Sequence, residues 1–209
     1  MTPSPTPPSF AAAVLAGGQS SRFGRDKAFV RWKGRRLLDR QLDLLRHLGP
    51  SQLVISGRPD ADYAVVGVTV VLDAVPGQGP LGGLAAVLSA TAAPHVLVLA
   101  VDLPAMTRGF LQSLLARRAP GVGVVPRIRL AGKAGWEPLA AVYPREILPL
   151  VRRHLARGGV AMHRLVEAGV TAGLLAEFPV PHASRAAFRN VNTPADFPKA
   201  PRPSWPGKA

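Results

Sequence analysis

The apolar stretch at residues 95–101 constrains the fold more than any other feature. It reads His-Val-Leu-Val-Leu-Ala-Val and is too short for a typical helix, but it suits a strand. A strand with no polar position after its first residue must be covered on both faces, as in the central parallel strands of α/β proteins. The stretch therefore predicts such a strand, which ends directly before Asp102. His95 would lie at the opposite end from a site at the carboxyl edge, so we interpret it as structural.

The rest of the chain alternates between strand and helix patterns. Apolar runs predict further strands at residues 10–15, 53–55, 65–72, 122–126, 137–143 and 174–178. Apolar residues at helical spacing predict helices at residues 37–48, 84–91, 108–118, 144–157 and 160–168. This alternation predicts an α/β fold, a three-layer Rossmann-like arrangement with a mostly parallel central sheet.

Three segments lack such patterns. Residues 127–135 are basic and contain glycine, and we interpret them as a mobile loop near the mouth of the site. The ends are rich in proline, which predicts a disordered tail at residues 1–9 and a loose tail at 198–209. A single domain is therefore expected over residues 10–197, and 47% hydrophobic content is enough for its core.

Composition narrows the class of protein. The chain has no cysteine, which excludes disulfides and thiolate sites and favours a cytoplasmic location. We expect no signal peptide at the start of the chain, which is broken by prolines, and no apolar run approaches the about 20 residues that span a membrane. The net charge of +14 comes from basic residues scattered along the chain without an RNA-binding signature, so we expect no nucleic-acid partner. Attraction of polyanionic substrates is the simpler use of this charge.

The first predicted strand, Phe10–Leu15, runs into a segment suited to binding phosphate. Gly17 and Gly18 would let backbone N–H groups approach an anion, and Arg22 and Lys27 would add positive charge. The spacing matches neither the P-loop nor the dinucleotide-binding glycine motif. A plain turn from strand to helix, with incidental basic residues, is the alternative.

Asp102 is the leading candidate for a metal ligand. A carboxylate at the end of a central strand can hold Mg²⁺, which prefers oxygen ligands and bridges protein to phosphate. The alternative is a structural role, because aspartate before Leu103 and Pro104 is a good turn former. Neither a Ser-His-Asp nor a His-Glu-x-x-His arrangement is present, so hydrolase and zinc functions have no support.

Four motifs follow one another along the chain. They are Leu-Ala-Gly-Gly-x-Ser-x-Arg-Phe-Gly-x-Asp-Lys at 15–27, Asp-x-x-Pro-Gly-x-Gly-Pro-Leu-Gly-Gly at 73–83, Val-Asp-Leu-Pro at 101–104 and Asn-Val-Asn-Thr-Pro at 190–194. Together they resemble the molybdenum cofactor guanylyltransferases, within the wider family of nucleotidyltransferases. The resemblance implies a nucleotidyltransferase fold and Mg²⁺ as cofactor. It also implies GTP and molybdopterin as substrates, with molybdoenzymes or their chaperones as protein partners.

The resemblance also implies roles for individual residues. Those for binding the nucleotide would be Leu15, Ala16, Gly17, Gly18, Lys27, Ser56, Asp73 and Asp102. Those for binding the acceptor would be Gly82, Asn190 and Asn192, and those for catalysis would be Lys27, Arg22 and Asp102. Asp26 would orient its loop rather than bind a ligand.

Three of these roles have alternatives. Ser56 stands where the family commonly has an asparagine, which puts its contact in doubt. Asp73 would contact base, ribose or metal, or would only begin a turn. Asn190 and Asn192 would bind the acceptor or form the turn before Pro194.

The expected reaction is transfer of GMP from GTP to molybdenum-loaded molybdopterin, with release of pyrophosphate. The alternatives are transfer from CTP, transfer to another phosphorylated acceptor, and a weakly catalytic nucleotide-binding partner of a molybdoenzyme. Related cytidylyl enzymes tend to have alanine where this chain has Gly17, and a residue without Cβ lets the backbone lie closer to a wide purine. We therefore predict a preference for GTP.

Overall fold

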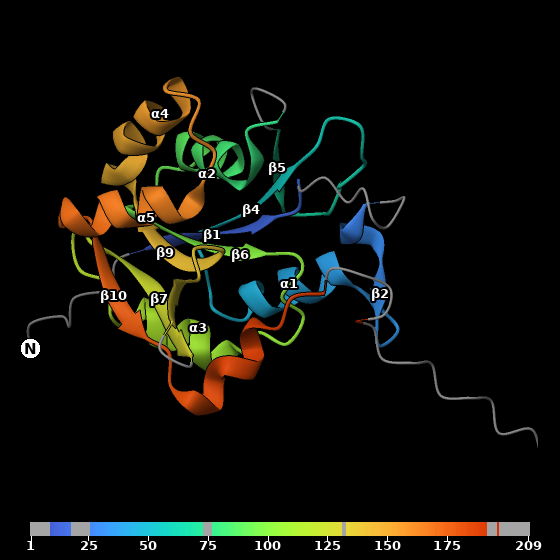
Figure 1. Ribbon diagram of the computed structural model, residues 1–209. Helices are drawn as coiled ribbons and strands as arrows, with labels where there is room; N and C mark the ends of the chain where they lie inside the picture. Colours follow the sequence, from blue (N-terminus) through green and yellow to red (C-terminus); the bar gives the residue numbers. More distant parts are fainter. Residues whose placement is uncertain (1–8, 18–25, 73–76, 131–132, 192–195, 197–209) are drawn as a thin grey trace, which may run out of the picture.

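The computed structural model describes residues 9–17, 26–72, 77–130, 133–191 and 196. These residues form three layers, with a central sheet between two layers of helices (Figure 1). The strands are β1 (Phe10–Leu15), β2 (Arg31–Trp32), β3 (Arg35–Arg36), β4 (Gln52–Gly57), β5 (Thr69–Leu72), β6 (His95–Ala100), β7 (Gly123–Leu130), β8 (Lys133–Trp136), β9 (Ala140–Pro144) and β10 (Leu175–Pro179). The α-helices are α1 (Leu37–Arg46), α2 (Gly79–Ala90), α3 (Arg108–Leu115), α4 (Leu148–Ala156) and α5 (Met162–Thr171), and the 3₁₀ helices are η1 (Lys27–Phe29), η2 (Arg145–Ile147) and η3 (His182–Phe188).

The described strands form one large sheet and one small hairpin. The large sheet has the order β10-β7-β9-β6-β1-β4-β5, with β8 paired to β7, while β2 pairs with β3. The β1–β4, β1–β6, β4–β5 and β7–β10 pairs are parallel, and β9 runs antiparallel to β6 and β7. The predicted fold class is confirmed.

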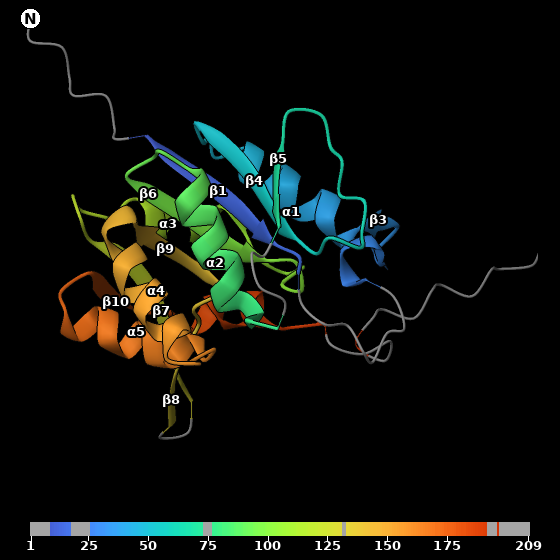
Figure 2. The same cartoon turned by 90° about the horizontal axis from the view of Figure 1, so that it is seen from above.

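The apolar runs form strands because each face of the sheet has its own core. Along β1, Ala12 and Val14 face one hydrophobic cluster and Ala11 and Ala13 face the other, as the alternation of side chains in a strand requires. Helices α1 and α3 with η3 cover the first face, and α2, α4 and α5 cover the second (Figure 2). Every residue of β1 and β6 is buried, as expected for strands covered on both sides.

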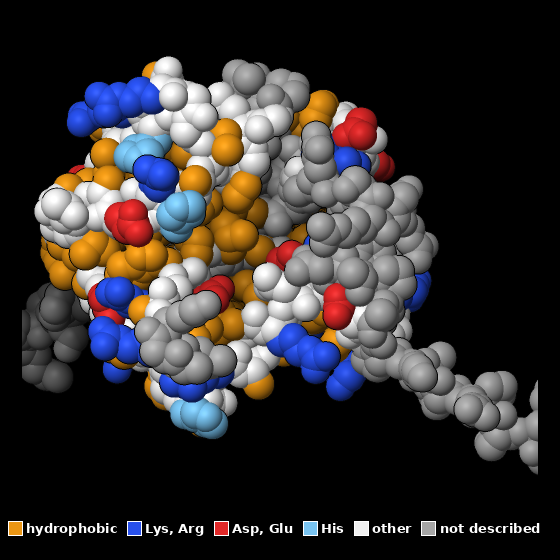
Figure 3. Space-filling model, in the orientation of Figure 1, with side chains coloured by type: hydrophobic (Ala, Val, Ile, Leu, Met, Phe, Trp, Pro, Cys, Tyr) orange, Lys and Arg blue, Asp and Glu red, His pale blue; other side chains and the backbone are white. Residues whose placement is uncertain are grey.

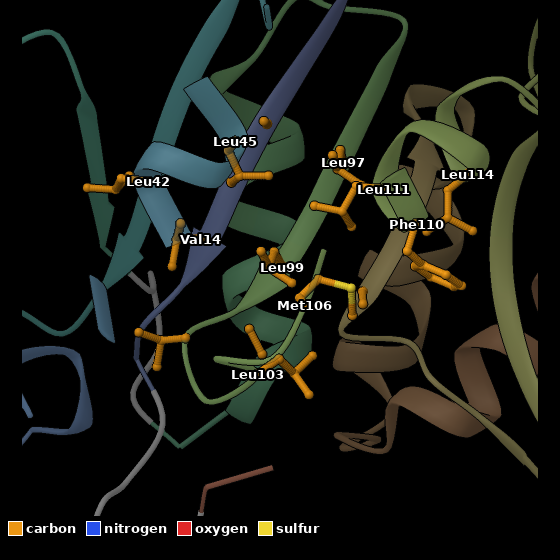
Figure 4. Packing of buried hydrophobic residues seen from close by; sticks show 14 of the residues in the cluster. Val14, Leu42, Leu45, Leu97, Leu99, Leu103, Met106, Phe110, Leu111 and Leu114 are labelled. Carbon is orange, nitrogen blue, oxygen red and sulfur yellow. The ribbon is translucent and has the colours of Figure 1, made fainter. Parts of the chain in front are cut away.

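Helix α1 shows how local sequence and packing agree. Its apolar positions Leu38, Leu42 and Leu45 repeat at helical spacing and are all buried against the first face. On the same face, Leu42 and Leu45 lie close to Val14 of β1, and α3 adds a further set of large side chains, as the close-up of the core shows (Figure 4). Phe110 of α3 meets the ring of Phe188 edge-on at 5.0 Å, which ties η3 to this layer.

One predicted loop is wrong. Residues 127–130 continue β7, and residues 133–136 return as β8, with Arg127 paired to Trp136. The physical reason is an alternation of polar and apolar residues: Ile128 packs against the core, while the guanidinium of Arg127 lies 4.6 Å from the centroid of the Trp136 ring. The predicted mobile segment is therefore a hairpin, apart from residues 131 and 132, which lie outside the described residues.

Several element boundaries also differ from the prediction. Strand β5 begins at Thr69 rather than at residue 65, β9 begins at Ala140 rather than at 137, and α2 begins at Gly79 rather than at 84. β6 has a parallel neighbour on one side only. His95 is buried, and its Nε2 lies within hydrogen-bonding distance of the Ala119 carbonyl (2.9 Å), in agreement with a structural role. The predicted tails lie outside the described residues except for residue 9. Within the described part, no helix is long and apolar enough to span a bilayer.

Candidate active site

The carboxyl ends of β1, β4 and β6 lie level with one another. Leu15 is paired with Ser56 of β4 and with the last residue of β6. Pairing continues past the strands, because the Ala16 N–H donates to the Ser56 carbonyl at 2.8 Å and the Val101 N–H donates to the Leu15 carbonyl at 3.1 Å. The segment that enters the glycine-rich loop and the segment that reaches Asp102 therefore leave the sheet side by side.

Lys27 and Asp102 meet at this edge although they are far apart in the sequence. Lys27 Nζ lies 3.4 Å from Asp102 Oδ2, and the two side chains are 17% and 22% exposed. Lys27 is the first residue of η1, and Asp102 follows β6 by two residues. This pair places a cation suited to phosphate oxygens beside an anion suited to a divalent metal.

Asp26 fixes the backbone that carries Lys27. Its buried carboxylate accepts a hydrogen bond from the Ala28 N–H at 2.9 Å and so caps η1. The Tyr63 hydroxyl donates to the other carboxylate oxygen, and Arg58 Nη2 lies 3.6 Å from it. Burial, helped by the contact with Asp26, raises the pKa of Tyr63 to about 12. The geometry agrees with an orienting role for Asp26.

Tyr63 reaches Asp26 because its ring lies very close to the end of β4. A Cβ added to Gly57 would lie 2.4 Å from the ring, so only glycine leaves room for it. On its other side the ring stacks on Phe29 of η1, with centroids 5.5 Å apart. The end of β4, Tyr63 and η1 therefore form one packed unit under Lys27.

Two further segments contact the end of β6 and its continuation to Asp102. The Val191 N–H donates to the Asp102 carbonyl at 3.0 Å, which places the exposed Asn190 next to the candidate site. The Ala100 N–H donates to the Leu139 carbonyl at 2.7 Å, so the turn before β9 lies at the same edge. Figure 3 shows the molecule from the side of Figure 1, where a hollow in the middle is bordered by hydrophobic side chains and a few carboxylates.

The structure brings together most of the predicted site residues that it describes. These are Leu15, Ala16, Gly17, Lys27, Ser56, Asp102 and Asn190. Ser56 is only 1% exposed, and its carbonyl accepts the hydrogen bond from the Ala16 N–H. A direct contact of Ser56 with the nucleotide stays a prediction. Gly82 does not share the contacts above: it lies inside α2 and lines a groove of about 520 Å³ between α2, α4 and β5. Gly18, Arg22, Asp73 and Asn192 lie outside the described residues.

Sequence reasoning missed Glu137 as a candidate. The residue was assigned to a strand, but it stands in the turn between β8 and β9 with its carboxyl half-buried. Burial raises the pKa of this carboxyl from 4.5 to about 7. The only available signal was an acidic residue, followed by Pro138, directly before an apolar strand. Tyr63 and Arg58 were missed too, since nothing local marks them as neighbours of Asp26.

The donor set fits magnesium held jointly with a substrate. Within the described part of the chain, no three histidine, cysteine, aspartate or glutamate residues are grouped so as to hold a metal by themselves. Asp102 offers one hard, partly exposed carboxylate. Mg²⁺ is commonly bound by one or two carboxylates together with substrate phosphates and waters, so the chemistry of Asp102 suits that ion.

Comparison with known proteins decides the family. A family model described as the MobA-like NTP transferase domain matches residues 12–173. The chain belongs to the MobA-like NTP transferase family. The matched range includes most of β1, Lys27 and Asp102 and ends before Asn190. The resemblance drawn from the four motifs is confirmed.

Relatives cover nearly the whole chain. A protein from Opitutus terrae named "Probable molybdenum cofactor guanylyltransferase" is 40% identical over 189 residues, 89% of this chain and 92% of that protein. A "Molybdenum cofactor guanylyltransferase" from Pseudomonas putida is 31% identical over 163 residues, 77% of this chain and 84% of that protein.

Solved structures share the fold of this MobA-like transferase. Molybdopterin-guanine dinucleotide biosynthesis protein A from Archaeoglobus fulgidus superposes with a TM-score of 0.69 at 22% identity, covering 89% of this chain and 94% of that one. The 2-C-methyl-D-erythritol 4-phosphate cytidylyltransferase from Thermus thermophilus superposes with a TM-score of 0.64 at 19% identity, covering 88% and 93%. At these identities the likeness concerns the fold alone.

Proposed function

We propose that this MobA-like transferase moves a guanylyl group from GTP to molybdopterin and releases pyrophosphate. The observation that carries the proposal is the Lys27–Asp102 pair at the carboxyl edge, in a chain 40% identical to a relative named as a molybdenum cofactor guanylyltransferase. An oxygen of the acceptor phosphate attacks the α-phosphorus of GTP, a new P–O bond forms, and the bond to the β-phosphate oxygen breaks. No covalent nucleophile from the protein is needed.

The main task of the protein in such a reaction is to hold two polyanions in line and to balance their charge. Lys27 would bind the phosphate oxygens that leave, since its ammonium already lies at the edge, on a backbone fixed by Asp26. Backbone groups after Leu15 would frame guanine and ribose. Asp102 would hold Mg²⁺, whose charge stabilises the transferring phosphate when the ion is bound.

On this proposal the substrates are GTP and the molybdopterin cofactor, with hand-over of the product to a molybdoenzyme or its chaperone in the cytoplasm. Asn190, next to Asp102, would contact the acceptor. The acceptor phosphate would enter from the β9 side of β6, because β1 and β4 carry the candidate nucleotide residues on the other side.

Pyrophosphate release with each NTP tests the proposal. We expect release only with molybdopterin present, with GTP favoured over CTP, and we expect Gly17→Ala to erode the preference mainly through weaker use of GTP. A site that hydrogen-bonds its base discriminates by several kcal/mol, whereas steric fit alone gives about 1–3 kcal/mol. Equal incorporation of GMP and CMP, or a preference for CTP, would overturn the guanylyl assignment.

A further inference from the structure

The turn that carries Glu137 is held rigidly at the carboxyl edge. The Glu137 N–H donates to the Pro126 carbonyl at 2.9 Å, and the Ala140 N–H donates back to the Glu137 carbonyl at 3.4 Å. The hydroxyl of the fully buried Tyr143 donates to the Pro138 carbonyl at 2.7 Å. Burial also raises the pKa of Tyr143, so this hydroxyl remains a donor. The backbone at Glu137 is therefore fixed before any substrate arrives.

The carboxylate on this rigid turn has no protein partner within the described residues. Among them, no hydrogen bond or ion pair reaches its oxygens, although burial disfavours its charge. The nearby cation Arg127 is engaged elsewhere: its Nη1 lies 2.7 Å from Glu177 Oε2, and its guanidinium stacks on Trp136. Half-buried carboxylates left unpaired are costly, and a perturbed acidic group at such an edge marks a candidate binding site.

The position of Glu137 assigns it to one side of the reaction centre. Leu139, two residues further on, accepts a hydrogen bond from Ala100, the last residue of β6, and Asp102 lies two residues beyond Ala100. The turn thus borders the Asp102 segment from the β9 side, whereas Leu15 and Ser56 border it from the β1 side. A substrate that reaches Glu137 is therefore the acceptor rather than the nucleotide.

We propose that Glu137 recognises the acceptor by accepting hydrogen bonds from the amino-pyrimidinone edge of its pterin ring. This inference rests on the proposed function, which supplies a pterin acceptor. That edge presents a ring N–H and an exocyclic amino group side by side, and an ionised carboxylate accepts from both donors at once. Glutamine at the same position would offer one acceptor and would turn an N–H donor toward a donor of the ligand.

The first test is steady-state kinetics of guanylyl transfer to molybdopterin by wild type, Glu137→Gln and Glu137→Asp. We expect Glu137→Gln to raise the KM for molybdopterin about 10- to 100-fold, the loss expected for hydrogen bonds to a charged group. The KM for GTP and the kcat at saturating acceptor should stay close to wild type. Glu137→Asp keeps the charge on a shorter side chain, so its KM for molybdopterin should lie between those of wild type and Glu137→Gln. Glu167→Gln, on the exposed face of α5, is the matched control and should change neither KM.

The second test is direct binding, with 6-hydroxymethylpterin as the probe and its lumazine analogue, in which an oxo group replaces the 2-amino group. Wild type should bind the pterin more tightly than the lumazine, and Glu137→Gln should lose this preference. If Glu137 had a purely structural role, Glu137→Gln would weaken binding of the pterin and of the lumazine by the same factor.

The outcomes separate the inference from the proposed function. If transfer occurs but the acceptor KM and the pterin preference survive in Glu137→Gln, the inference is wrong and the function stands. A rise in the KM for GTP alone would likewise overturn it. If wild type shows no transfer yet binds pterin in a Glu137-dependent way, the recognition stands and the proposed reaction is wrong. Absence of pterin binding by wild type would overturn the inference.

Discussion

Replacing Glu137 by glutamine should stabilise the free protein in a pH-dependent way. Since the folded-state pKa of about 7 lies above the usual value of 4.5, the folded protein holds this proton more tightly than the unfolded chain. The contribution of this carboxyl to stability is therefore fully present below pH 4.5, falls as pH rises, and is lost above pH 7. Glutamine removes the charge and keeps the shape, so it removes this loss.

The size of the effect follows from the pKa. The rise from 4.5 to about 7 corresponds to at most about 3.4 kcal/mol at about 1.4 kcal/mol per pH unit. Because the carboxyl is only half-buried, solvent screening should leave about 1–2 kcal/mol. In a chain of this length each kcal/mol shifts Tm by about 2–4 °C.

Thermal unfolding of wild type, Glu137→Gln and Glu167→Gln at about pH 8 and at a pH near 4.5 would measure the gain in stability on removing the Glu137 charge. We expect Glu137→Gln to unfold at a higher temperature only at the higher pH, while the control follows wild type at both. An equal gain at both pH values would mean that charge burial is not the cause. A loss of stability at high pH would refute the reasoning outright.

Three further changes have expected outcomes. Asp102→Asn should abolish Mg²⁺-dependent turnover and leave Tm nearly unchanged, because asparagine removes the anionic ligand but keeps the volume of the side chain. Turnover at the wild-type rate would contradict the assignment of Asp102 as the metal ligand. Tyr63→Phe should lower stability by about 1–3 kcal/mol and slow the reaction, because the buried Asp26 loses a donor; urea unfolding and kcat measure the two effects. Gly123→Ala should destabilise by about 1–3 kcal/mol or more, because its Cβ would lie 2.2 Å from a backbone oxygen of β9. Gly135→Ala, where a Cβ meets nothing within 4 Å, is its control in thermal unfolding, and equal effects of the two changes would count against the steric argument.

The elements that were predicted well from the sequence are those in which the local pattern of apolar residues indicates which positions are buried. Strand β1 was predicted with its observed bounds, because the apolar run that begins at Phe10 is followed by two glycines. The hairpin of β7 and β8 was not predicted, because its charge and glycine favour a loop, although Arg127-Ile-Arg-Leu130 alternates as a half-buried strand does. The antiparallel partner of β6 was missed for another reason: pairing depends on β9, some 40 residues away, and no local pattern encodes it.

The same distinction holds for the candidate site. Lys27 and Asp102 were predicted from their own motifs, and the fold brings them to 3.4 Å. The contact of Asp26 with Tyr63 could not be predicted, because it depends on how the ring packs beside Gly57. The importance of Glu137 depends on desolvation, which only packed surroundings define.

Backbone hydrogen bonds continue past the strand ends at the carboxyl edge, with donors at Ala16, Ala100, Val101 and Val191. They join five chain segments that lie far apart in the sequence, so a segment that leaves the edge must break at least one of these hydrogen bonds. These four amides should exchange with deuterium only when the whole domain unfolds. The part of the candidate site that these described segments form then persists as long as the fold does. A destabilising change in a distant strand would lower the fraction of folded molecules and would not separate these described segments in the molecules that stay folded.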